Sequence, residues 1–245
     1  MKRTAAAVLT LAAILPPAPS GLFAGTHPSV SSASSGLTMH PELQAYIALR
    51  IAEFGSIPAE RRAILEDLGA FIGARMRAGK PCDLTFICTH NSRRSHMGQV
   101  WGAVAAAHFG IPGVTTYSGG TEATAFNPRA VKALLRAGLA IEKTTEASNP
   151  IYHVRFGPDA PALTCFSKVF NQAPNPTVDF CAVMTCADAD EKCPIVHGAA
   201  ARFAIPYEDP KAFDGVKLES AKYDERCAQI ARDMLYALSR TGHPE

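Results

Sequence analysis

Cys88 is the residue of this sequence with the plainest capacity for chemistry. It ends the apolar run 84–88, which has the composition of a short buried strand. The loop 89–95 follows, and a helical pattern begins at His96. A loop between a strand and a helix can direct backbone N–H groups, and the positive end of the helix dipole, towards one anion. The same setting favours the nucleophilic thiolate form of a cysteine. The sequence therefore predicts a thiolate nucleophile at the mouth of an oxyanion-binding loop.

Arg94 is the second candidate, six residues after Cys88. Its planar guanidinium could bind two oxygens of a tetrahedral oxyanion at once. Ser95 could give a hydroxyl hydrogen bond to the sulfur, and Asn91 could bond the loop backbone while tolerating a left-handed conformation. The residues expected to bind the oxyanion or support the loop are Thr89, His90, Asn91, Ser92, Arg93, Arg94 and Ser95. A buried structural cysteine is the alternative, but Cys-x5-Arg-Ser between a strand and a helix favours the reactive one.

Two further cysteines, Cys186 and Cys193, flank the acidic run 187–192 directly after a predicted strand. Acidic side chains favour an exposed, mobile segment, in which successive thiol–disulfide exchanges would be possible. Two other interpretations stay open. The pair could be unreactive or statically bonded, or Cys181, Cys186, Cys193 and His197 could bind zinc. Their spacings differ from the tight Cys-x2-Cys zinc motifs, and Cys181 is expected to point into the sheet core.

Asp209-Pro210 follows the segment 204–207, which is interpreted as the last strand. A carboxylic acid near the mouth of the loop could protonate a departing oxygen, and proline would stiffen the segment that presents it. Asp-Pro is also common in ordinary turns, so from spacing alone both interpretations stand. Glu208 is a possible substitute for the acid.

The elements that must position these residues alternate along the chain. Predicted strands cover 84–88, 114–117, 180–185 and 204–207, and predicted helices cover 96–109, 127–137 and 219–238. The helix at 127 has a strong start, because Asn127 can cap it and Pro128 suits its first position. Strands alternating with helices are typical of an α/β fold, here a three-layer sandwich with a short central parallel sheet.

Two more helices are predicted ahead of the first strand, at 41–54 and 58–78, with Gly79 ending the second. We expect them to pack together as an N-terminal helical hairpin. The expected organisation is a leader at 1–38, a helical extension at 39–80 and a catalytic domain at 81–245.

The leader allows two interpretations. Lys2 and Arg3 precede an apolar run at 5–15, as in a secretory signal, which would make the protein periplasmic or exported. The run is too short to cross a bilayer, and no other segment predicts a membrane span. If translation begins near Met39 instead, the protein would be cytoplasmic.

Composition narrows the functional classes. The 245 residues are 47% hydrophobic and 19% charged, a globular balance. The formal net charge of +2 provides no general basic field, so no nucleic-acid partner is expected. Seven cysteines, an odd number, are too few for a secreted disulfide scaffold of this length. Most thiols are expected to be reduced, with structural roles for Cys82, Cys165 and Cys227.

Cys88-x-x-Asn91-x-x-Arg94-Ser95 resembles the active loop of low-molecular-weight protein tyrosine phosphatases and of their relatives, the thioredoxin-coupled arsenate reductases. One departure is His90, where these families usually carry glycine. The resemblance implies a low-molecular-weight phosphatase-like fold, Asp209 as the general acid, and no metal or organic cofactor. The two helices before Gly79 have no counterpart in the minimal fold of this superfamily.

The arsenate reductases of the superfamily use three cysteines, and Cys186 and Cys193 resemble the second and third. The resemblance thus implies reduction of arsenate to arsenite by a thiol cascade, with Cys88 as the first nucleophile and a thioredoxin-like reductant as partner. The alternative is a low-molecular-weight protein tyrosine phosphatase that hydrolyses phosphotyrosine or small phosphate esters through a phospho-cysteine. That enzyme would share Cys88, Arg94 and Asp209.

Overall fold

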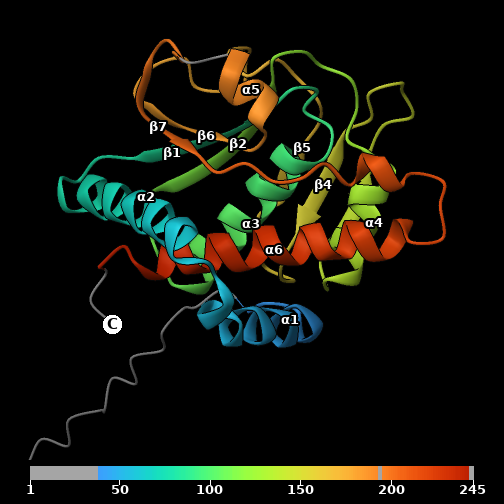
Figure 1. Ribbon diagram of the computed structural model, residues 1–245, viewed down its shortest axis with the longest axis horizontal. Coiled ribbons are helices and arrows are strands. Elements are labelled where there is room, and N and C mark those ends of the chain that lie inside the picture. Colours follow the sequence, from blue (N-terminus) through green and yellow to red (C-terminus); the bar gives the residue numbers. More distant parts are fainter. Residues whose placement is uncertain (1–37, 193–194, 243–245) are drawn as a thin grey trace, which may run out of the picture. The chain divides into compact units, whose positions relative to one another are not determined.

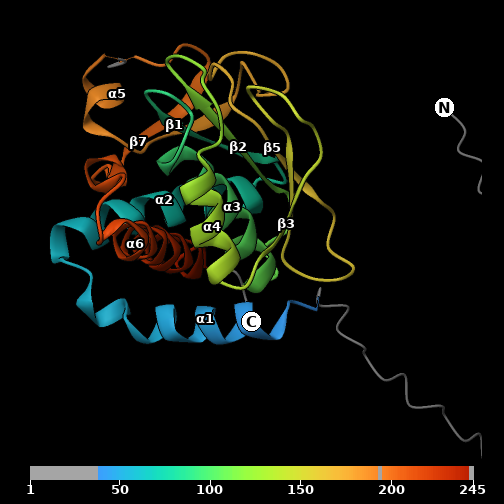
Figure 2. The ribbon, with the colours of Figure 1, turned by 90° about the vertical axis from the view of Figure 1, so that its right-hand side faces the viewer.

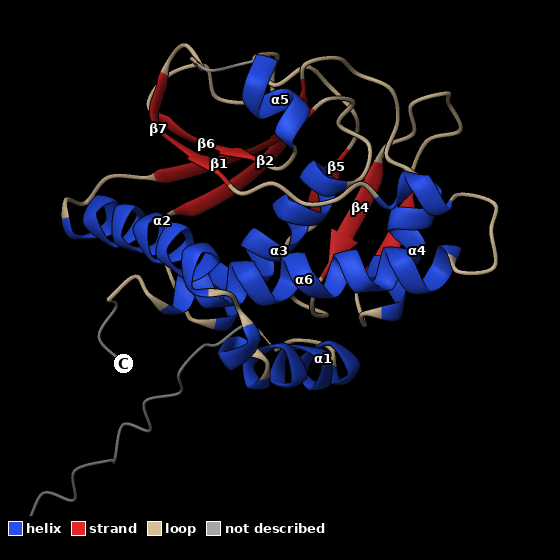
Figure 3. Cartoon of the chain, in the orientation of Figure 1, coloured by secondary structure: helices blue, strands red, loops and turns tan. Residues whose placement is uncertain are grey.

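A computed structural model of the protein describes residues 38–192 and 195–242 (Figures 1 and 3). Residues 1–37, which hold nearly all of the expected leader, lie outside the described residues, and so does Cys193. None of the described helices combines the length and the apolar character that a membrane span requires.

A four-stranded parallel sheet carries the fold, in the order β2-β1-β6-β7. Its strands are β1 (Cys82–Cys88), β2 (Val114–Gly120), β6 (Phe180–Met184) and β7 (Ala199–Ala204). The predicted three-layer α/β sandwich with a short central parallel sheet is confirmed (Figure 1).

Helices cover both faces of this sheet (Figure 1). On one face, α3 (Arg94–His108) packs against β1 and β2, and α6 (Glu219–Ser239) packs on α3. On the other face, the short α5 (Ala187–Lys192) lies over β1 and β6. A Cβ atom on Gly98 of α3 would lie 2.5 Å from the Phe86 ring, so the glycine lets α3 lie close to β1.

Two predictions about the C-terminal half are wrong. The last strand is β7, at Ala199–Ala204, and the segment 205–209 is not strand, although the Ile205 and Tyr207 N–H groups still donate to Met184 O and Thr185 O. The acidic run forms the short helix α5 and not an irregular loop, and its carboxylates Asp188 and Asp190 lie in the first turn, where the helix dipole favours them.

A second, antiparallel sheet of β3 (Ala140–Lys143), β4 (Tyr152–Arg155) and β5 (Leu163–Cys165) was not predicted. Along the chain, α4 (Pro128–Arg136) lies between β2 and β3. Asn127 caps its start, because the Asn127 side chain accepts a hydrogen bond from the Arg129 N–H. The predicted cap of this helix is thereby confirmed.

The two N-terminal helices are α1 (Pro41–Ala52) and α2 (Ala59–Arg77), joined through the 3-10 turn η1 (Phe54–Ser56). Gly79 follows α2 with a φ of +64°, as expected of a glycine that ends a helix. Each helix packs mainly against α6, and α2 also reaches β1 and β7, whereas the two helices do not pack extensively against each other (Figure 2). The extension is therefore built onto the core through α6.

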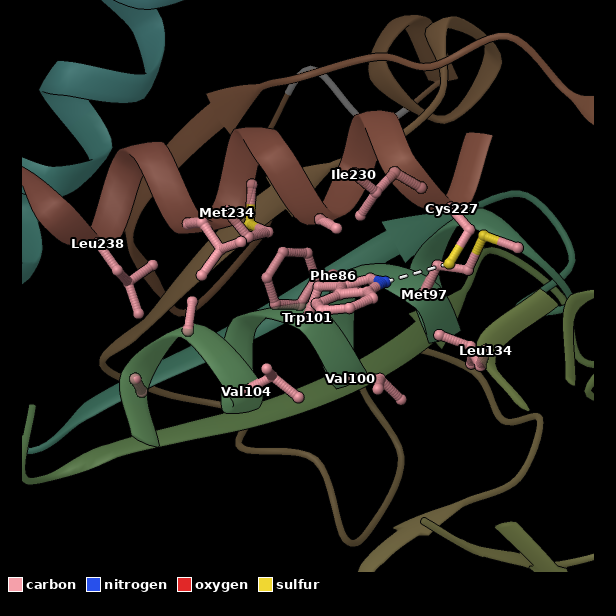
Figure 4. Packing of buried hydrophobic residues seen from close by; sticks show 14 of the residues in the cluster. Phe86, Met97, Val100, Trp101, Val104, Leu134, Cys227, Ile230, Met234 and Leu238 are labelled. Atoms are coloured by element: carbon pink, nitrogen blue, oxygen red, sulfur yellow. Dashed lines mark hydrogen bonds between the residues drawn. The ribbon is translucent and has the colours of Figure 1, made fainter. Parts of the chain in front are cut away.

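Trp101 lies at the centre of the core between α3 and α6 (Figure 4). Its indole N–H donates to Cys227 Sγ at 3.3 Å, and its ring stacks on Tyr46 of α1 with ring centroids 5.4 Å apart. Burial raises the pKa of the Cys227 and Cys82 thiols to about 11 and that of Cys165 to about 12. These three thiols remain protonated at neutral pH, as structural cysteines should.

Candidate active site

Cys88 stands at the carboxyl end of β1, at the start of the predicted loop, and is 3% exposed. Its Sγ lies 3.0 Å from Ser95 Oγ. Asn91 Nδ2 donates to the same Ser95 oxygen at 2.9 Å. Because this donation occupies an acceptor position of the hydroxyl, Ser95 can direct its single hydrogen to the sulfur. Asn91 thus orients the Ser95 hydroxyl so that it can donate a hydrogen bond to a Cys88 thiolate.

The carbonyl groups of the loop point away from the cradle, because residues outside the loop bind them. Thr121 and Glu122 donate to the carbonyls of Cys88 and Thr89 through their backbone N–H groups, at 3.1 and 2.9 Å. The other carbonyl contacts are Thr121 Oγ1 to Thr89, Thr124 Oγ1 and Ser167 Oγ to His90, Asn127 N to Ser92, and Met97 N to Arg93.

The amide N–H groups of residues 89–95 donate to no other described residue. With the carbonyls turned outward, these amides and the start of α3 are left for an anion. The loop therefore has the construction that its sequence predicted, and the segments 121–127 and 166–168 are what hold it.

Asn91 occupies the left-handed region, with φ +44°, and is fully buried. Its Oδ1 accepts the Lys168 N–H at 2.8 Å, so its side chain ties the loop to a neighbouring segment rather than to the loop's own backbone. Gly120, at the end of β2, lies directly against the backbone of the loop. A Cβ atom there would lie 2.6 Å from Thr89 O and 2.7 Å from Asn91 N.

Arg94 is oriented by the segment that follows β7. Its Nη1 donates to Tyr207 O at 2.8 Å and its Nη2 to Asp209 Oδ2 at 2.8 Å. The buried Nε makes no hydrogen bond within the described chain. Asp209 Oδ1 accepts the Lys211 N–H at 3.0 Å and so caps the 3-10 turn η2 (Pro210–Phe213). Folding thus brings Arg94 and Asp209 together across 115 residues.

The side chains of Arg93 and His90 bind residues outside the loop, and Arg93 Nε also lies 3.9 Å from Asp209 Oδ1. Arg93 donates to Tyr223 Oη at 2.7 Å and to Asp214 Oδ2 at 3.2 Å, which braces the loop against α6. His90, nearly half exposed, has its Nε2 3.1 Å from Glu122 Oε1. Their side chains can support the loop, but anion binding at these two positions is left to the backbone.

Cys186 lies immediately before α5 and is 1% exposed. Its Sγ is 3.5 Å from Thr89 Oγ1, on the residue next to Cys88, and accepts the Ala189 N–H at 3.4 Å. Cys186 and Cys88 belong to one buried cluster on the α5 face of the sheet. Two of the three predicted thiols are therefore neighbours, although 97 residues separate Cys186 from Thr89.

The zinc alternative requires Cys181 and Cys186 to bind the same ion, but the two residues lie on opposite faces of the sheet. Cys181 packs in the core cluster on the α3 face of the sheet, whereas Cys186 lies in the cluster on the α5 face. Within the described ranges, no group of three or more His, Cys, Asp or Glu side chains is arranged to hold a metal ion. Cys193 lies outside these ranges.

A pocket of about 550 Å³ opens beside the Arg94–Asp209 pair. Glu208, the possible substitute acid, lines it together with Arg226 of α6. Burial lowers the pKa of the Arg226 guanidinium. Sequence reasoning missed Arg226, because an arginine on an amphipathic helix carries no local signal that distinguishes a pocket wall from a solvated face.

No protein-family model matches the chain. A low-molecular-weight protein tyrosine phosphatase from T. tengcongensis is a solved structure similar to this chain, at 15% identity and a TM-score of 0.44, over 64% of this chain and 98% of that one. The arsenate reductase of Bacillus licheniformis is 29% identical over 159 residues, which cover 64% of this chain and 94% of that protein. The arsenate reductase of Shouchella clausii is 31% identical over 134 residues, or 55% of this chain and 78% of that protein.

The identity to the Shouchella clausii reductase, 78% of which is covered, shows that the chain belongs to the arsenate reductase family and is an enzyme of that family.

Proposed function

We propose that this protein reduces arsenate to arsenite through a cascade of three thiols, Cys88, Cys186 and Cys193, with a thioredoxin-like protein as reductant. Family membership supports the substrate, since the similar proteins are named arsenate reductases. The observation that carries the cascade is the burial of Cys186 against Thr89, in the same cluster as Cys88. Hydrolysis of a phospho-cysteine by water needs only one reactive cysteine, so it gives no role to a second thiol beside the loop.

Arsenate would bind in the cradle of loop amides. Residues 89–95 offer N–H groups that no other described residue accepts, and Arg94 adds a buried Nε–H beside them. Hydrogen bonds to a charged oxyanion are strong in a site sheltered from water. The cradle would hold the arsenic atom in front of Cys88 Sγ.

Cys88 would attack arsenic, and one arsenate oxygen would depart as water. Asp209 is the proposed proton donor for that oxygen. As the carboxylate lies, both of its oxygens are engaged, by Arg94 and by the Lys211 N–H. Proton transfer therefore requires Asp209 to release Arg94 and to form a hydrogen bond with the substrate. The Arg94 guanidinium would then bind the remaining oxygens of arsenate.

Cys186 would act next, as a thiolate that attacks Cys88 Sγ. The new S–S bond forms as the S–As bond breaks, and its electron pair stays on arsenic, which leaves as arsenite. Cys193 would then attack Cys186, return Cys88 as a thiolate and leave a Cys186–Cys193 disulfide. A dithiol reductant would reduce this disulfide and close the cycle.

The decisive experiment supplies arsenate with thioredoxin, thioredoxin reductase and NADPH, and compares the wild type with Cys186→Ser and Cys193→Ser. Multiple turnover should fall by more than about a hundredfold in both variants, while cleavage of p-nitrophenyl phosphate is retained, because that reaction needs only Cys88, Arg94 and Asp209. Cys82→Ser is the matched control, since it also replaces a buried cysteine. Undiminished arsenate turnover in Cys193→Ser would contradict the cascade.

Hydrolysis of phosphate esters remains the second candidate, because its residues are the same three. In that case water, rather than Cys186, would resolve the adduct on Cys88. The experiment above separates the two, since a dedicated phosphatase would turn over no arsenate and would lose nothing in Cys186→Ser.

The reductant also depends on where the protein works. A cytoplasmic protein that starts near Met39 would meet thioredoxin, whereas an exported one would need another thiol donor. We propose the cytoplasmic alternative, and a mature N-terminus measured near Gly25 would contradict it.

A further inference from the structure

The added helix α2 places one side chain against the segment that carries Asp209. Arg61 of α2 lies with its guanidinium carbon 4.5 Å from the centroid of the Tyr207 ring. The ring of Tyr207 is 4% exposed, so this contact is shielded from water. A cation over an aromatic face is attracted by the ring quadrupole, more strongly where water is excluded.

Arg61 is itself held in place by a buried carboxylate. Its Nε donates to Asp233 Oδ2 at 3.0 Å, and Asp233, on α6, is 0% exposed. Arg232 binds the other oxygen of the same carboxylate, at 3.2 Å. A buried carboxylate requires cationic partners, so the Asp233 carboxylate holds the Arg61 guanidinium in place over the Tyr207 ring.

Tyr207 in turn holds the catalytic arginine through its backbone. Its carbonyl accepts Arg94 Nη1 at 2.8 Å, and its N–H donates to Thr185 O at 3.1 Å. Asp209 is two residues further along. The position of the Tyr207 ring therefore sets the position of the backbone that orients Arg94 and presents Asp209.

We propose that Arg61 is a positioning residue for the acid segment 205–209, acting through the ring of Tyr207, so that the N-terminal extension forms an outer layer of the active site. The proposal rests on the proposed function only in taking Asp209 as the proton donor. The aligned stretch covers 64% of this chain but 94% of the Bacillus licheniformis reductase, so this chain carries a substantial segment that the relative lacks. Arg61 lies in the helices that have no counterpart in the minimal fold.

Small displacements of a catalytic group are costly, because a misplacement of about 1 Å can reduce a rate roughly a hundredfold. Without Arg61, the Tyr207 ring loses the group that lies against its face, and the segment 205–209 is expected to open more often. Binding of the anion by the loop amides would be unaffected, since Arg61 contacts none of them. The defect should therefore appear in kcat and not in KM.

The test compares Arg61→Ala with Arg61→Lys and with the control Arg62→Ala, at a neighbouring arginine of α2 for which the structure shows no ion pair among the described residues. Arg61→Ala should lower kcat for phosphate esters by about tenfold, with KM changed less than about twofold. The loss should be larger for phenyl phosphate than for p-nitrophenyl phosphate, since the poorer leaving group depends more on the acid. Arg61→Lys should recover part of the loss, and Arg62→Ala should leave both rates unchanged.

Arg61→Ala leaves Asp233 with one cation fewer and could lower the stability of the fold. A second variant, Arg61→Met with Asp233→Asn, removes both charges and keeps the volume. It should show the same leaving-group dependence at an unchanged melting temperature. Equal losses for both esters, or a loss only in variants with a lowered melting temperature, would overturn the proposal.

Hydrogen exchange provides a readout that needs no turnover. In Arg61→Ala, exchange of the Ile205 and Tyr207 amides, which bind Met184 O and Thr185 O, should accelerate by about tenfold, while the amides of β1 stay protected. Unchanged exchange at both amides would refute the role of Arg61. If the wild type reduces no arsenate but this exchange pattern holds, the proposed function fails and the positioning role stands.

Discussion

Ser95 is the side chain that contacts the sulfur of Cys88. It receives a hydrogen bond from Asn91 and faces Cys88 Sγ at 3.0 Å. Asn91 is in turn fixed by the Lys168 N–H. Contacts of Ser95 and Asn91 therefore connect the Cys88 sulfur to the segment at Lys168.

Lys168 provides a residue-scale prediction about pH. Its side chain is buried, with Nζ 3.3 Å from Phe166 O and 4.5 Å from the centroid of the Phe166 ring, and burial lowers its pKa to about 8. Below pH 8 the amine is charged in both the folded and the unfolded chain, and the folded state carries the full cost of burying that charge. Between pH 8 and about 10.5 the unfolded chain binds the additional proton, so stability gains as pH rises.

Lys168→Met should therefore stabilise the protein at pH 7 by roughly 3 kcal/mol at most, and the gain should shrink as the pH approaches 10. Urea denaturation of both proteins at several pH values measures the difference. Lys132→Met, at an exposed lysine of α4, is the control and should change the free energy of unfolding by less than about 0.5 kcal/mol. A difference between Lys168→Met and wild type that does not vary with pH would contradict this account.

At the scale of elements, the active loop depends on its neighbours more than on its own bonds. Strand β1 delivers Cys88, helix α3 begins with Arg94, and the segment after β2 binds the outward carbonyls. Gly120 is the point where β2 meets the loop. Backbone atoms of Thr89 and Asn91 would lie within 2.7 Å of a Cβ atom there and cannot rotate aside.

Gly120→Ala should therefore displace the loop while leaving the sheet in place. We expect kcat/KM to fall by about a hundredfold, for arsenate and for phosphate esters alike, because both depend on the same cradle. Gly55→Ala is the matched control, since a Cβ atom on Gly55 has no heavy atom within 4 Å. Circular dichroism should show both variants folded. Full activity of Gly120→Ala would mean that the loop is not held from this side.

At the scale of the whole molecule, the N-terminal helices and the sheet share one core. The Trp101 ring stacks on Tyr46 of α1, and its indole N–H donates to Cys227 of α6 (Figure 4). Helix α2 is tied to α6 by the Arg61–Asp233 pair. Removing either helix would expose apolar faces of α6, so we expect the extension to unfold together with the catalytic part.

Trp101 is the single tryptophan of the sequence and reports on this joint core. In urea, its fluorescence and the far-UV circular dichroism should change in one coincident transition, because loss of α1 uncovers the indole as the helices melt. Two separated midpoints would contradict a shared core. Tyr46→Ala should lower the midpoint, at a cost of about 3 kcal/mol, without splitting the transition.

The sequence was sufficient to predict the features that depend only on residues adjacent in the chain. The strand, the Cys88–Ser95 loop and the start of α3 follow one another directly, so their types and order sufficed to predict the anion cradle. The Asn127 cap and the Gly79 helix end are equally local. Periodicity also located the long helices and the central parallel sheet, because a buried face leaves a regular pattern in the chain.

Only the tertiary structure decided which distant groups meet. Arg94 lies beside Asp209, Cys186 beside Thr89, and Arg61 over Tyr207, each across more than 90 residues. Such contacts depend on the order of strands and on the packing of helices, to which local propensity contributes little. The same reason explains the misplaced last strand and the missed antiparallel sheet, since a strand such as β7 is stabilised by pairing with β6 and not by its own alanine-rich sequence.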